Sequence, residues 1–177
     1  GKEGIHVNLR IVDDQCRDIH TADPGEILVQ GPNVFSRYWN NETATKAAFR
    51  DGWFCTGDMG RRDEEGFVYI VGRKVEMIIS SGENIYPVEV ERALQTLPGV
   101  KEAAVVGIPD PKRGEVVGAF IIPNREVQMS EADIINALSG KIANFKVPKR
   151  IFIVDEFPRN QSGKVLKRIL KKRVEGQ

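Results

Sequence analysis

The segment YIVGRKVEMIISSGENIYPVEVE, residues 69–91, is where the pattern of the chain changes. Up to Arg73, short apolar runs alternate with turn signals, which is typical of small antiparallel strands. Beyond Val75, helical and extended patterns alternate. Pro87 can open a helix there, because the first helical turn has no need of the N–H that proline lacks. The sequence therefore predicts an α+β chain of two parts, divided at residues 73–75.

The first part, residues 1–73, is predicted to be a small β-barrel or sheet subdomain. Its apolar residues recur with the period of two that half-buried strands require, apart from one stretch with helical spacing. The expected elements are strands at 5–14 and 25–31, a helix at 42–50, and a hairpin at 53–73 that turns at the sequence DEEG.

The second part, residues 74–177, is predicted to be a compact mixed α/β domain. Its helices are marked by a proline start and by a variant of the capping box at Ser130 and Asp133. The expected elements are a helix from Pro87 to about Leu97, strands at 101–108 and 114–123, a helix from about residue 131, a strand at 150–155 and a last helix at 165–172.

Composition limits the class of protein. With 177 residues, 41% of them hydrophobic and 29% charged, the chain can bury one modest core or two small ones. Cys16 and Cys55 have no CxxC spacing, so neither a zinc site nor a disulfide framework is expected, and a reducing, cytoplasmic setting is the expectation. No apolar run approaches the roughly 20 residues that a membrane-spanning helix needs.

The charge is unevenly distributed. The net charge is +1, but residues 141–173 carry eleven Lys and Arg against two acidic residues, a local charge of 11 − 2 = +9. Such a segment attracts phosphate groups of nucleotides, coenzyme A, RNA or anionic lipids, although a charge run is also a common solvated face.

Two further motifs accompany residues 69–91. In DGWFCTGD, residues 51–58, Gly57 allows a sharp backbone turn and Asp58 offers an acceptor-only carboxylate, which can accept hydrogen bonds from a vicinal diol. A turn Asp that caps local N–H groups is the alternative. In PRNQSGKVLKR, residues 158–168, Lys164 follows a Ser-Gly turn, where its ammonium could meet the charge that develops in phosphoryl transfer. An ordinary exposed lysine is the alternative there.

Together, the three motifs resemble the C-terminal motif set of the adenylate-forming enzymes, which include acyl-CoA synthetases, firefly-luciferase-like proteins and peptide-synthetase adenylation domains. The resemblance extends over essentially all of this chain but over only about the C-terminal third of the family's length. GENIYPVEVE is more similar to fatty-acyl and aryl-CoA synthetases than to peptide synthetases. The resemblance implies that the chain is the C-terminal end of an ATP-dependent enzyme. Such an enzyme forms an acyl-adenylate from a carboxylic acid, here expected to be a fatty acid, and passes the acyl group to coenzyme A.

The resemblance also implies roles for single residues. Asp58 would hold the ribose hydroxyls of ATP and AMP, and Arg73 would contact the nucleotide. Lys164 would act in adenylation. Gly82, beside Ser81, would let the pantetheine arm of coenzyme A pass close to the backbone.

At residues 74 and 75 the chain departs from the family pattern. Two residues after the arginine, the family usually has an Asp or Lys about which the C-terminal domain rotates between half-reactions, and here that position is Val75. Either Lys74 takes the hinge role or rotation is slower, because a β-branched residue restricts the backbone. Ile79 likewise replaces a common Lys, and Ser81 a frequent Gly.

The family's phosphate loop and its later Thr-Glu segment, which bind pyrophosphate, magnesium and the acyl group, have no counterpart in this sequence. They are expected in a larger N-terminal domain of the same chain, of which residues 1–73 would be the end, with residues 74–177 as the mobile C-terminal domain. No metal site is expected here, and the isolated fragment is expected to be inactive.

Three alternatives stay open. A luciferase-like or carrier-loading enzyme would use the same adenylate with another acceptor. A nucleic-acid module would rest on the basic segment alone, which lacks interleaved aromatic residues, so no nucleic-acid partner is expected. A peripheral membrane contact would use the apolar stripe of the last helix, which can equally pack on its own domain. That stripe consists of Val165, Leu166, Ile169 and Leu170.

Overall fold

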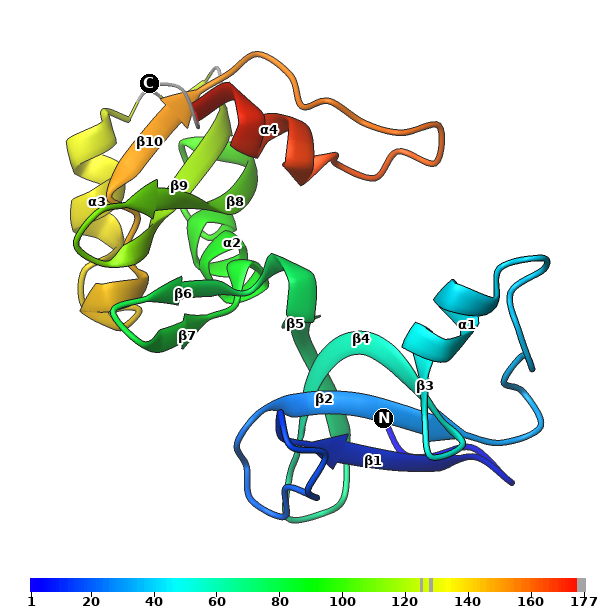
Figure 1. The fold of residues 1–177 in the computed structure, drawn as a ribbon. Helices are drawn as coiled ribbons and strands as arrows, with labels where there is room; N and C mark the ends of the chain where they lie inside the picture. The colour runs from blue at the N-terminus through cyan, green and yellow to red at the C-terminus, as the bar shows by residue number, and fades with distance from the viewer. Residues whose placement is uncertain (125, 128, 175–177) are drawn as a thin grey trace. The chain divides into compact units, whose positions relative to one another are not determined.

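The computed structural model describes residues 1–124, 126–127 and 129–174. The chain divides into two compact units, Gly1–Val75 (unit 1) and Glu76–Gln177 (unit 2), which are described separately below. Unit 1 is mainly β, and unit 2 combines a sheet with helices, so the α+β class predicted from the sequence is confirmed (Figure 1).

Unit 1 is built on one antiparallel sheet with the strand order β1-β2-β4-β3, in which β5 also pairs with β4. Register shifts in β2 and β4 bend the sheet, and β4 arches visibly in Figure 1. The elements are β1 (Asn8–Val12), β2 (Gly25–Gln30), α1 (Glu42–Ala48), β3 (Phe49–Arg50), β4 (Trp53–Arg62) and β5 (Val68–Arg73).

The bend in β4 depends on Gly60. A Cβ at this position would lie 2.6 Å from Cδ1 of Ile27 and 3.2 Å from the carbonyl oxygen of Tyr69. Glycine therefore lets β2 and β5 approach the same point of β4. A small core lies beside it, formed by Ile11, Val12, Ile27, Leu28 and Met59.

Helix α1 is shorter than predicted. Asn41 caps it by accepting a hydrogen bond from the N–H of Ala44 at 2.9 Å, and it ends at Ala48. Phe49, which we assigned to the helix, instead pairs with Phe54 in the sheet, with ring centroids 5.5 Å apart. Aromatic packing against β4 thus outweighs the local helical pattern.

Unit 2 has a five-stranded mixed sheet with the order β10-β9-β6-β7, in which β8 also pairs with β9. The pairing of β10 with β9 is parallel and the other pairings are antiparallel. Its elements are β6 (Ile78–Ser80), β7 (Glu83–Ile85), α2 (Pro87–Gln95), β8 (Val100–Asp110), β9 (Gly114–Pro123), α3 (Glu131–Leu138), a 3-10 turn (Asn144–Lys146), β10 (Arg150–Ile153) and α4 (Lys167–Val174). A further 3-10 turn, Lys74–Glu76, spans the division between the units.

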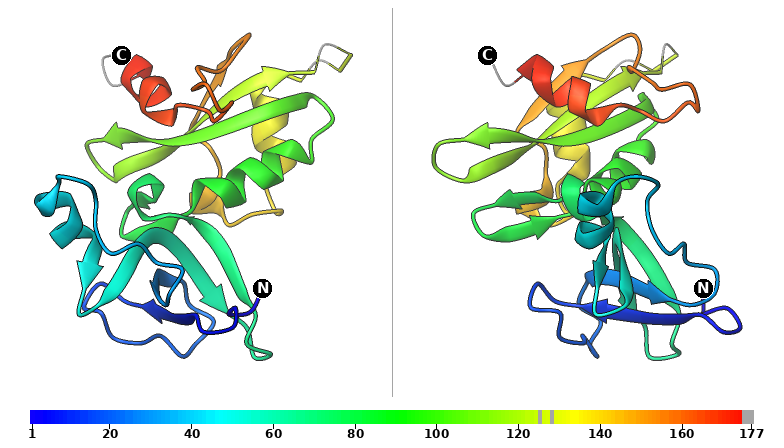
Figure 2. Two further views of the ribbon diagram at one scale, coloured as in Figure 1. Left: turned by 90° about the vertical axis from the view of Figure 1, so that its right-hand side faces the viewer. Right: turned by 45° about the vertical axis from the view of Figure 1, so that its right-hand side comes forward.

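The central strand β9 is buried on both faces, which explains its unbroken apolar sequence. Val117, Ala119 and Ile121 face a cluster that includes residues of α2 and α3. Val116 and Phe120 face the opposite cluster, where α4 packs. Figures 1 and 2 show α2 and α3 on one side of the β8–β9 pair and α4 on the other.

The apolar stripe of the last helix packs within unit 2. Leu170 is fully buried and Val174 is nearly so, in a cluster with Phe157, and Val165 packs against the same cluster. The packing alternative considered for the stripe therefore holds for Val165 and Leu170, while Leu166 and Ile169 are half-buried. In the described part of the chain, no helix is long and apolar enough to span a membrane.

Candidate functional site

In unit 1, strand pairing brings Asp58 and Arg73 together. They are direct partners across β4 and β5, and Nε of Arg73 lies 2.9 Å from Oδ1 of Asp58. Nη1 of Arg73 also donates to the carbonyl oxygen of Thr56 at 3.0 Å. Gly57, between Thr56 and Asp58, has a φ of +70°, the left-handed conformation that the TGD turn requires.

The Asp58–Arg73 pair remains accessible. The two side chains are 30% and 47% exposed, and the N–H of Asp58 is bonded to Oγ1 of Thr56 at 3.0 Å. A carboxylate has about four acceptor sites and a guanidinium five N–H donors, so an ion pair leaves both with unused capacity. The pair can therefore offer acceptors to a diol and donors to phosphate or ribose oxygens at one place.

The connector next to the unit boundary is anchored on its unit 1 side. Nζ of Lys74 lies 3.0 Å from Oε2 of buried Glu26 and 3.0 Å from Oδ1 of Asp14. Burial disfavours the charged form of Lys74, but its hydrogen bonds to Glu26 and Asp14 outweigh burial and raise its pKa. Val75 follows with 91% of its surface exposed.

Glu76 is anchored in unit 2. Its Oε2 lies 3.0 Å from Nζ of Lys167, at the start of α4. Lys167 also lies 2.8 Å from Oε1 of Glu91 on α2, and the same Oε1 accepts the N–H of Val105 on β8 at 2.8 Å. Lys167 therefore ties the first residue of unit 2 to the elements around it.

Ser81 and Gly82 form the two-residue turn between β6 and β7. Their φ values are +52° and +86°, and positive φ at both positions defines a type I′ hairpin turn. The N–H of Ser81 donates to the carbonyl oxygen of Arg113 at 2.9 Å. A Cβ on Gly82 would meet no heavy atom within 4 Å, so the backbone is open on that side.

Lys164 lies on an exposed loop between β10 and α4. Arg159 and Val165 form an isolated antiparallel bridge at its base, and Gly163 turns the chain with a φ of +81°. The loop therefore presents the lysine from a narrow, paired base.

Of the predicted residues, Asp58 and Arg73 are in direct contact, whereas Lys164 and the Ser81–Gly82 turn lie on separate loops of unit 2. Two features that hold the candidate site residues in place were not predicted from the sequence. The ion pair of Lys167 with Glu76 joins residues 91 positions apart, for which the sequence has no local signal. Asn160 did have a local signal, since Asn is a frequent turn former, but no role was predicted for it.

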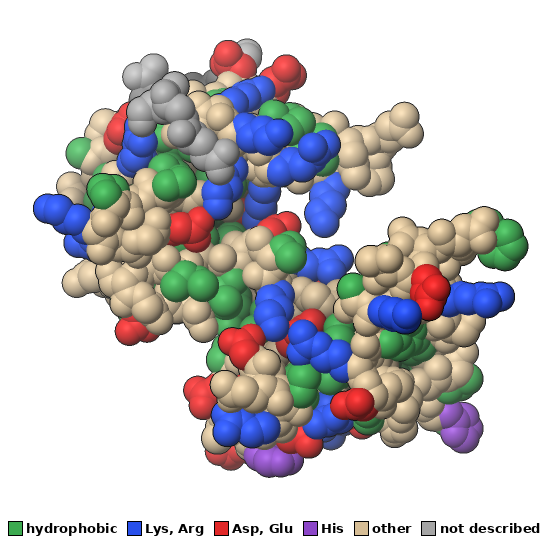
Figure 3. Space-filling view, in the orientation of Figure 1, with side chains coloured by type: hydrophobic (Ala, Val, Ile, Leu, Met, Phe, Trp, Pro, Cys, Tyr) green, Lys and Arg blue, Asp and Glu red, His purple; other side chains and the backbone are tan. Residues whose placement is uncertain are grey.

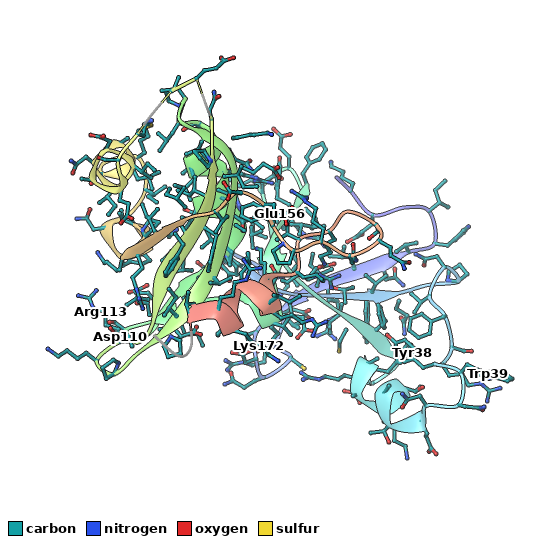
Figure 4. The ribbon with its side chains drawn as sticks, turned by 90° about the horizontal axis from the view of Figure 1, so that it is seen from above. Tyr38, Trp39, Asp110, Arg113, Glu156 and Lys172 are labelled. Carbon is teal, nitrogen blue, oxygen red and sulfur yellow. The ribbon has the colours of Figure 1, made fainter. Side chains whose placement is uncertain are left out.

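The basic segment 141–173 is partly neutralised. Its members lie on α4, on the 3-10 turn, on β10 and on the loops between them, and Figure 3 shows Lys and Arg side chains gathered around α4. Lys172 projects from α4 in Figure 4. Four of the eleven basic residues are paired with glutamates outside the segment, which weakens the nucleic-acid alternative. The pairs are Lys146–Glu89, Arg159–Glu102, Lys167 with Glu76 and Glu91, and Lys171–Glu115.

Neither cysteine forms a disulfide in the structure. Burial, followed by the nearby Glu26 carboxylate, raises the pKa of the Cys55 thiol and so keeps it protonated at neutral pH. Within residues 1–124, 126–127 and 129–174, no group of three or more His, Cys, Asp or Glu could hold a metal ion.

Residues 89–164, which end at Lys164, match a family model described as the AMP-binding enzyme C-terminal domain. The chain carries an AMP-binding enzyme C-terminal domain. The resemblance drawn from the motifs is thereby confirmed.

Two curated proteins similar to this chain are CoA ligases. The chain is 47% identical over 167 residues to an indoleacetate–CoA ligase of Aromatoleum aromaticum, covering 94% of this chain and 33% of the relative. It is 48% identical over 175 residues to a 2-succinylbenzoate–CoA ligase of Bacillus mycoides, covering 99% and 36%. The chain spans about a third of the length of these curated relatives.

The chain is also similar to a solved structure of a CoA synthetase. The o-succinylbenzoate CoA synthetase MenE of Bacillus subtilis, in complex with the acyl-adenylate intermediate OSB-AMP, matches with a TM-score of 0.91 and 40% identity. The match covers 97% of this chain and 35% of that one. The AMP-binding C-terminal domain thus has a counterpart in an enzyme that holds an adenylate.

Proposed function

We propose that the chain is the C-terminal portion of an AMP-forming acid–thiol ligase, which converts a carboxylic acid, ATP and coenzyme A to an acyl-CoA, AMP and pyrophosphate. The observation that carries the proposal is the exposed loop that presents Lys164 at the end of the AMP-binding enzyme domain. The larger N-terminal portion would supply the acid pocket and the magnesium site, so the 177-residue chain alone is expected to be inactive.

In the first half-reaction, a carboxylate oxygen attacks the α-phosphorus of ATP, and the bond from that phosphorus to the pyrophosphate oxygen breaks. Negative charge gathers on the non-bridging oxygens as two anions approach. We assign to Lys164 the role of meeting this charge, since an ammonium delivered at that point stabilises the transition state more than the ground state. Magnesium, when bound, would neutralise the phosphates further.

Asp58 and Arg73 are proposed to hold the nucleotide throughout. The carboxylate would accept hydrogen bonds from the two ribose hydroxyls, and the guanidinium, fixed by Thr56 and Asp58, would contact ribose or phosphate oxygens. Because both side chains are set by the pairing of β4 with β5, the nucleotide meets a prearranged donor and acceptor.

In the second half-reaction, the thiol sulfur of coenzyme A attacks the acyl carbon, the acyl–AMP bond breaks, AMP leaves and the thiol proton is released. The turn at Ser81 and Gly82 is proposed to border the pantetheine arm. The open space beside the Gly82 backbone supports this, because a thin chain could pass there and any larger residue would fill it.

Rotation between the half-reactions is proposed to occur at Val75. Lys74 is held by Glu26 in unit 1, and Glu76 is held by Lys167 in unit 2, so the ion pairs fix the residues on both sides of the connector. Val75, 91% exposed, lies between them. This arrangement gives Lys74 an anchoring role and leaves the φ and ψ angles of Val75 to absorb the change.

For the acid, we propose an aryl-containing carboxylate as the first class to test, because two of the curated relatives are named for indoleacetate and 2-succinylbenzoate. A fatty acid, the class expected from the sequence, is the second class. Coenzyme A is the proposed acceptor, and a carrier-bound thiol or a luciferase-like reaction is the alternative.

The test is AMP release by the full-length enzyme with aryl, short, medium and long-chain acids, with and without coenzyme A. Lys164→Ala is compared with Lys172→Ala, a matched change at another exposed lysine. We expect acid-dependent AMP that coenzyme A stimulates, and that persists in Lys172→Ala and is lost in Lys164→Ala. If none of the acids leads to AMP release, the proposed function is overturned.

A further inference from the structure

One side-chain oxygen organises the loop that carries Lys164. Oδ1 of Asn160 accepts hydrogen bonds from the N–H of Ser162 at 3.1 Å, from Oγ of Ser162 at 2.8 Å and from the N–H of Lys164 at 2.8 Å. Such bonds from an Asn to the backbone ahead of it are those of an Asx turn. The Asn160 oxygen therefore collects three donors from the tip of the loop.

The backbone of Asn160 closes the same turn. Its N–H donates to the carbonyl oxygen of Lys164 at 3.0 Å, and its carbonyl oxygen accepts from the N–H of Gly163 at 3.0 Å. Lys164 is thus bonded to Asn160 through both its N–H and its carbonyl group. These bonds fix the Lys164 backbone while its side chain stays exposed.

Arg159 ties the closed turn to the sheet. Its Nη1 donates to the carbonyl oxygen of Gly163 at 2.9 Å, and its Nη2 forms an ion pair with Glu102 on β8. The loop tip therefore has a fixed conformation and a fixed attachment within unit 2. Asn160 adds local order near the tip that Arg159 cannot supply, because a guanidinium has no acceptor for the N–H of Lys164.

Local order matters for this lysine in particular. A lysine ammonium sits on a flexible four-carbon stem, so its reach is set by where its backbone is held. A small misplacement of a group that must meet a transition state lowers the rate considerably more than it lowers binding.

We propose that Asn160 is a positioning residue for Lys164, acting through its side-chain oxygen as a hydrogen-bond acceptor. This inference rests on the proposed function, in which Lys164 meets the transition-state charge of adenylation. Asn160 does not touch the substrate in this account. Its effect is carried by the backbone of Lys164.

The acceptor role can be isolated by two substitutions of similar size. Asn160→Asp keeps an oxygen where Oδ1 lies, whereas Asn160→Leu removes every acceptor on the side chain. Asn144→Leu, a matched change at an exposed asparagine in the 3-10 turn Asn144–Lys146, controls for the general effect of a surface leucine.

The first experiment measures backbone amide hydrogen exchange in the 177-residue chain. We expect the Ser162 and Lys164 amides to exchange roughly tenfold faster or more in Asn160→Leu than in the native chain, as loss of a closing hydrogen bond predicts. They should stay protected in Asn160→Asp and Asn144→Leu. Unchanged exchange of the core amides of Val105 and Ile121 shows that the variants are folded. Equal protection of the loop amides in all the folded variants would overturn the proposal.

The second experiment separates the half-reactions in the full-length enzyme. Asn160→Leu should lower the maximal rate of adenylation by about tenfold or more, with little change in KM for ATP, and should leave thioester formation from supplied acyl-adenylate intact. Asn160→Asp should restore most of the rate. If Asn160→Leu unfolds the enzyme, Asn160→Ala serves in its place.

The outcomes distinguish the proposed function of Lys164 from the positioning role of Asn160. If Lys164→Ala retains adenylation, the proposed function of Lys164 fails, while the exchange experiment still tests the turn. If Lys164→Ala loses adenylation and Asn160→Leu does not, only the positioning role of Asn160 fails. Loss of both half-reactions in a folded Asn160→Leu enzyme would also contradict positioning.

Discussion

Nε of Arg73 lies 2.9 Å from Oδ1 of Asp58, directly across the paired strands β4 and β5. The two residues are fifteen positions apart in the sequence, and the hairpin between them sets their distance. Because each side chain is partly exposed and each keeps bonding capacity beyond the pair, the hairpin presents a charged donor and acceptor side by side.

Asp58→Asn should weaken nucleotide binding in the full-length enzyme. A hydrogen bond to a charged group contributes about 1.5–3 kcal/mol, which corresponds to roughly ten- to a hundredfold in Kd. Titration calorimetry with AMP measures the change. Glu64→Gln, an exposed residue in the turn of the same hairpin, is the control and should bind AMP normally. Equal affinity in Asp58→Asn and Glu64→Gln would remove Asp58 from the nucleotide site.

Val75→Pro should impair the passage between half-reactions. A proline fixes its own φ and restricts the residue before it, here Lys74. In the full-length enzyme we expect overall turnover to fall at least about tenfold while one half-reaction, measured alone, stays near its native rate. Val75→Ala should turn over at least as fast as the native enzyme. Unchanged turnover in Val75→Pro would place the pivot elsewhere.

The Ser81–Gly82 turn offers a test of stability. Ser81 adopts a φ of +52°, and type I′ turns favour Asn followed by Gly. Ser81→Asn should therefore stabilise unit 2 by about 0.5 kcal/mol, and Ser81→Val should destabilise it by roughly 1–2 kcal/mol, because a left-handed conformation is costly for most L-residues. Urea unfolding followed by a probe in unit 2 measures both. The opposite order of stability would show that the turn does not persist in solution.

Ser130 caps α3, since its Oγ accepts the N–H of Asp133 at 3.2 Å. Ser130→Ala should lower the free energy of unfolding by about 1 kcal/mol at neutral pH. Ser139→Ala, at the other end of the helix, should have a smaller effect, because its hydroxyl donates to a carbonyl group and does not cap an N–H.

The cap also predicts a pH dependence. Hydrogen bonds from the side chain and then the backbone of Ser130 lower the pKa of Asp133 below its ordinary value of 3.8. A lowered carboxyl pKa stabilises the fold above the unfolded-state value, and this contribution is lost as the pH falls through the folded-state value. The difference between native chain and Ser130→Ala should therefore shrink in acid. A difference that grows in acid would contradict the capping box.

Much of the fold could be predicted from local patterns. GEVVGAFIIP coincides with β9, because a continuous apolar run between Gly114 and Pro123 has few alternatives to a strand buried on both faces. Ser130 and Asp133 marked the start of α3, because a capping box is written in adjacent residues. The hairpin pattern placed Asp58 and Arg73 on neighbouring strands, whereas the register shift between Met59 and Gly60 that makes them direct partners has no signal in the sequence.

The remaining features depend on distant contacts. Phe49 lies in a strand and not in the predicted helix, because it packs on Phe54 in the sheet. Strands β6 and β7 have three residues each, too few for a clear alternating pattern. Lys167 gave no sign of its role, because its partner Glu76 lies 91 positions earlier in the chain. Tertiary packing alone brings such residues together.

The central claim is that Lys164 serves adenylation and not thioester formation. The most direct measurement compares the two half-reactions in the full-length enzyme, with acyl-adenylate formation from acid and ATP in one assay and thioester formation from supplied acyl-adenylate and coenzyme A in the other. We predict that Lys164→Ala loses the first and keeps the second, and that Gly82→Leu does the reverse. If both variants, shown to be folded, lose both half-reactions to the same extent, the assignment of Lys164 and Gly82 to separate steps is wrong.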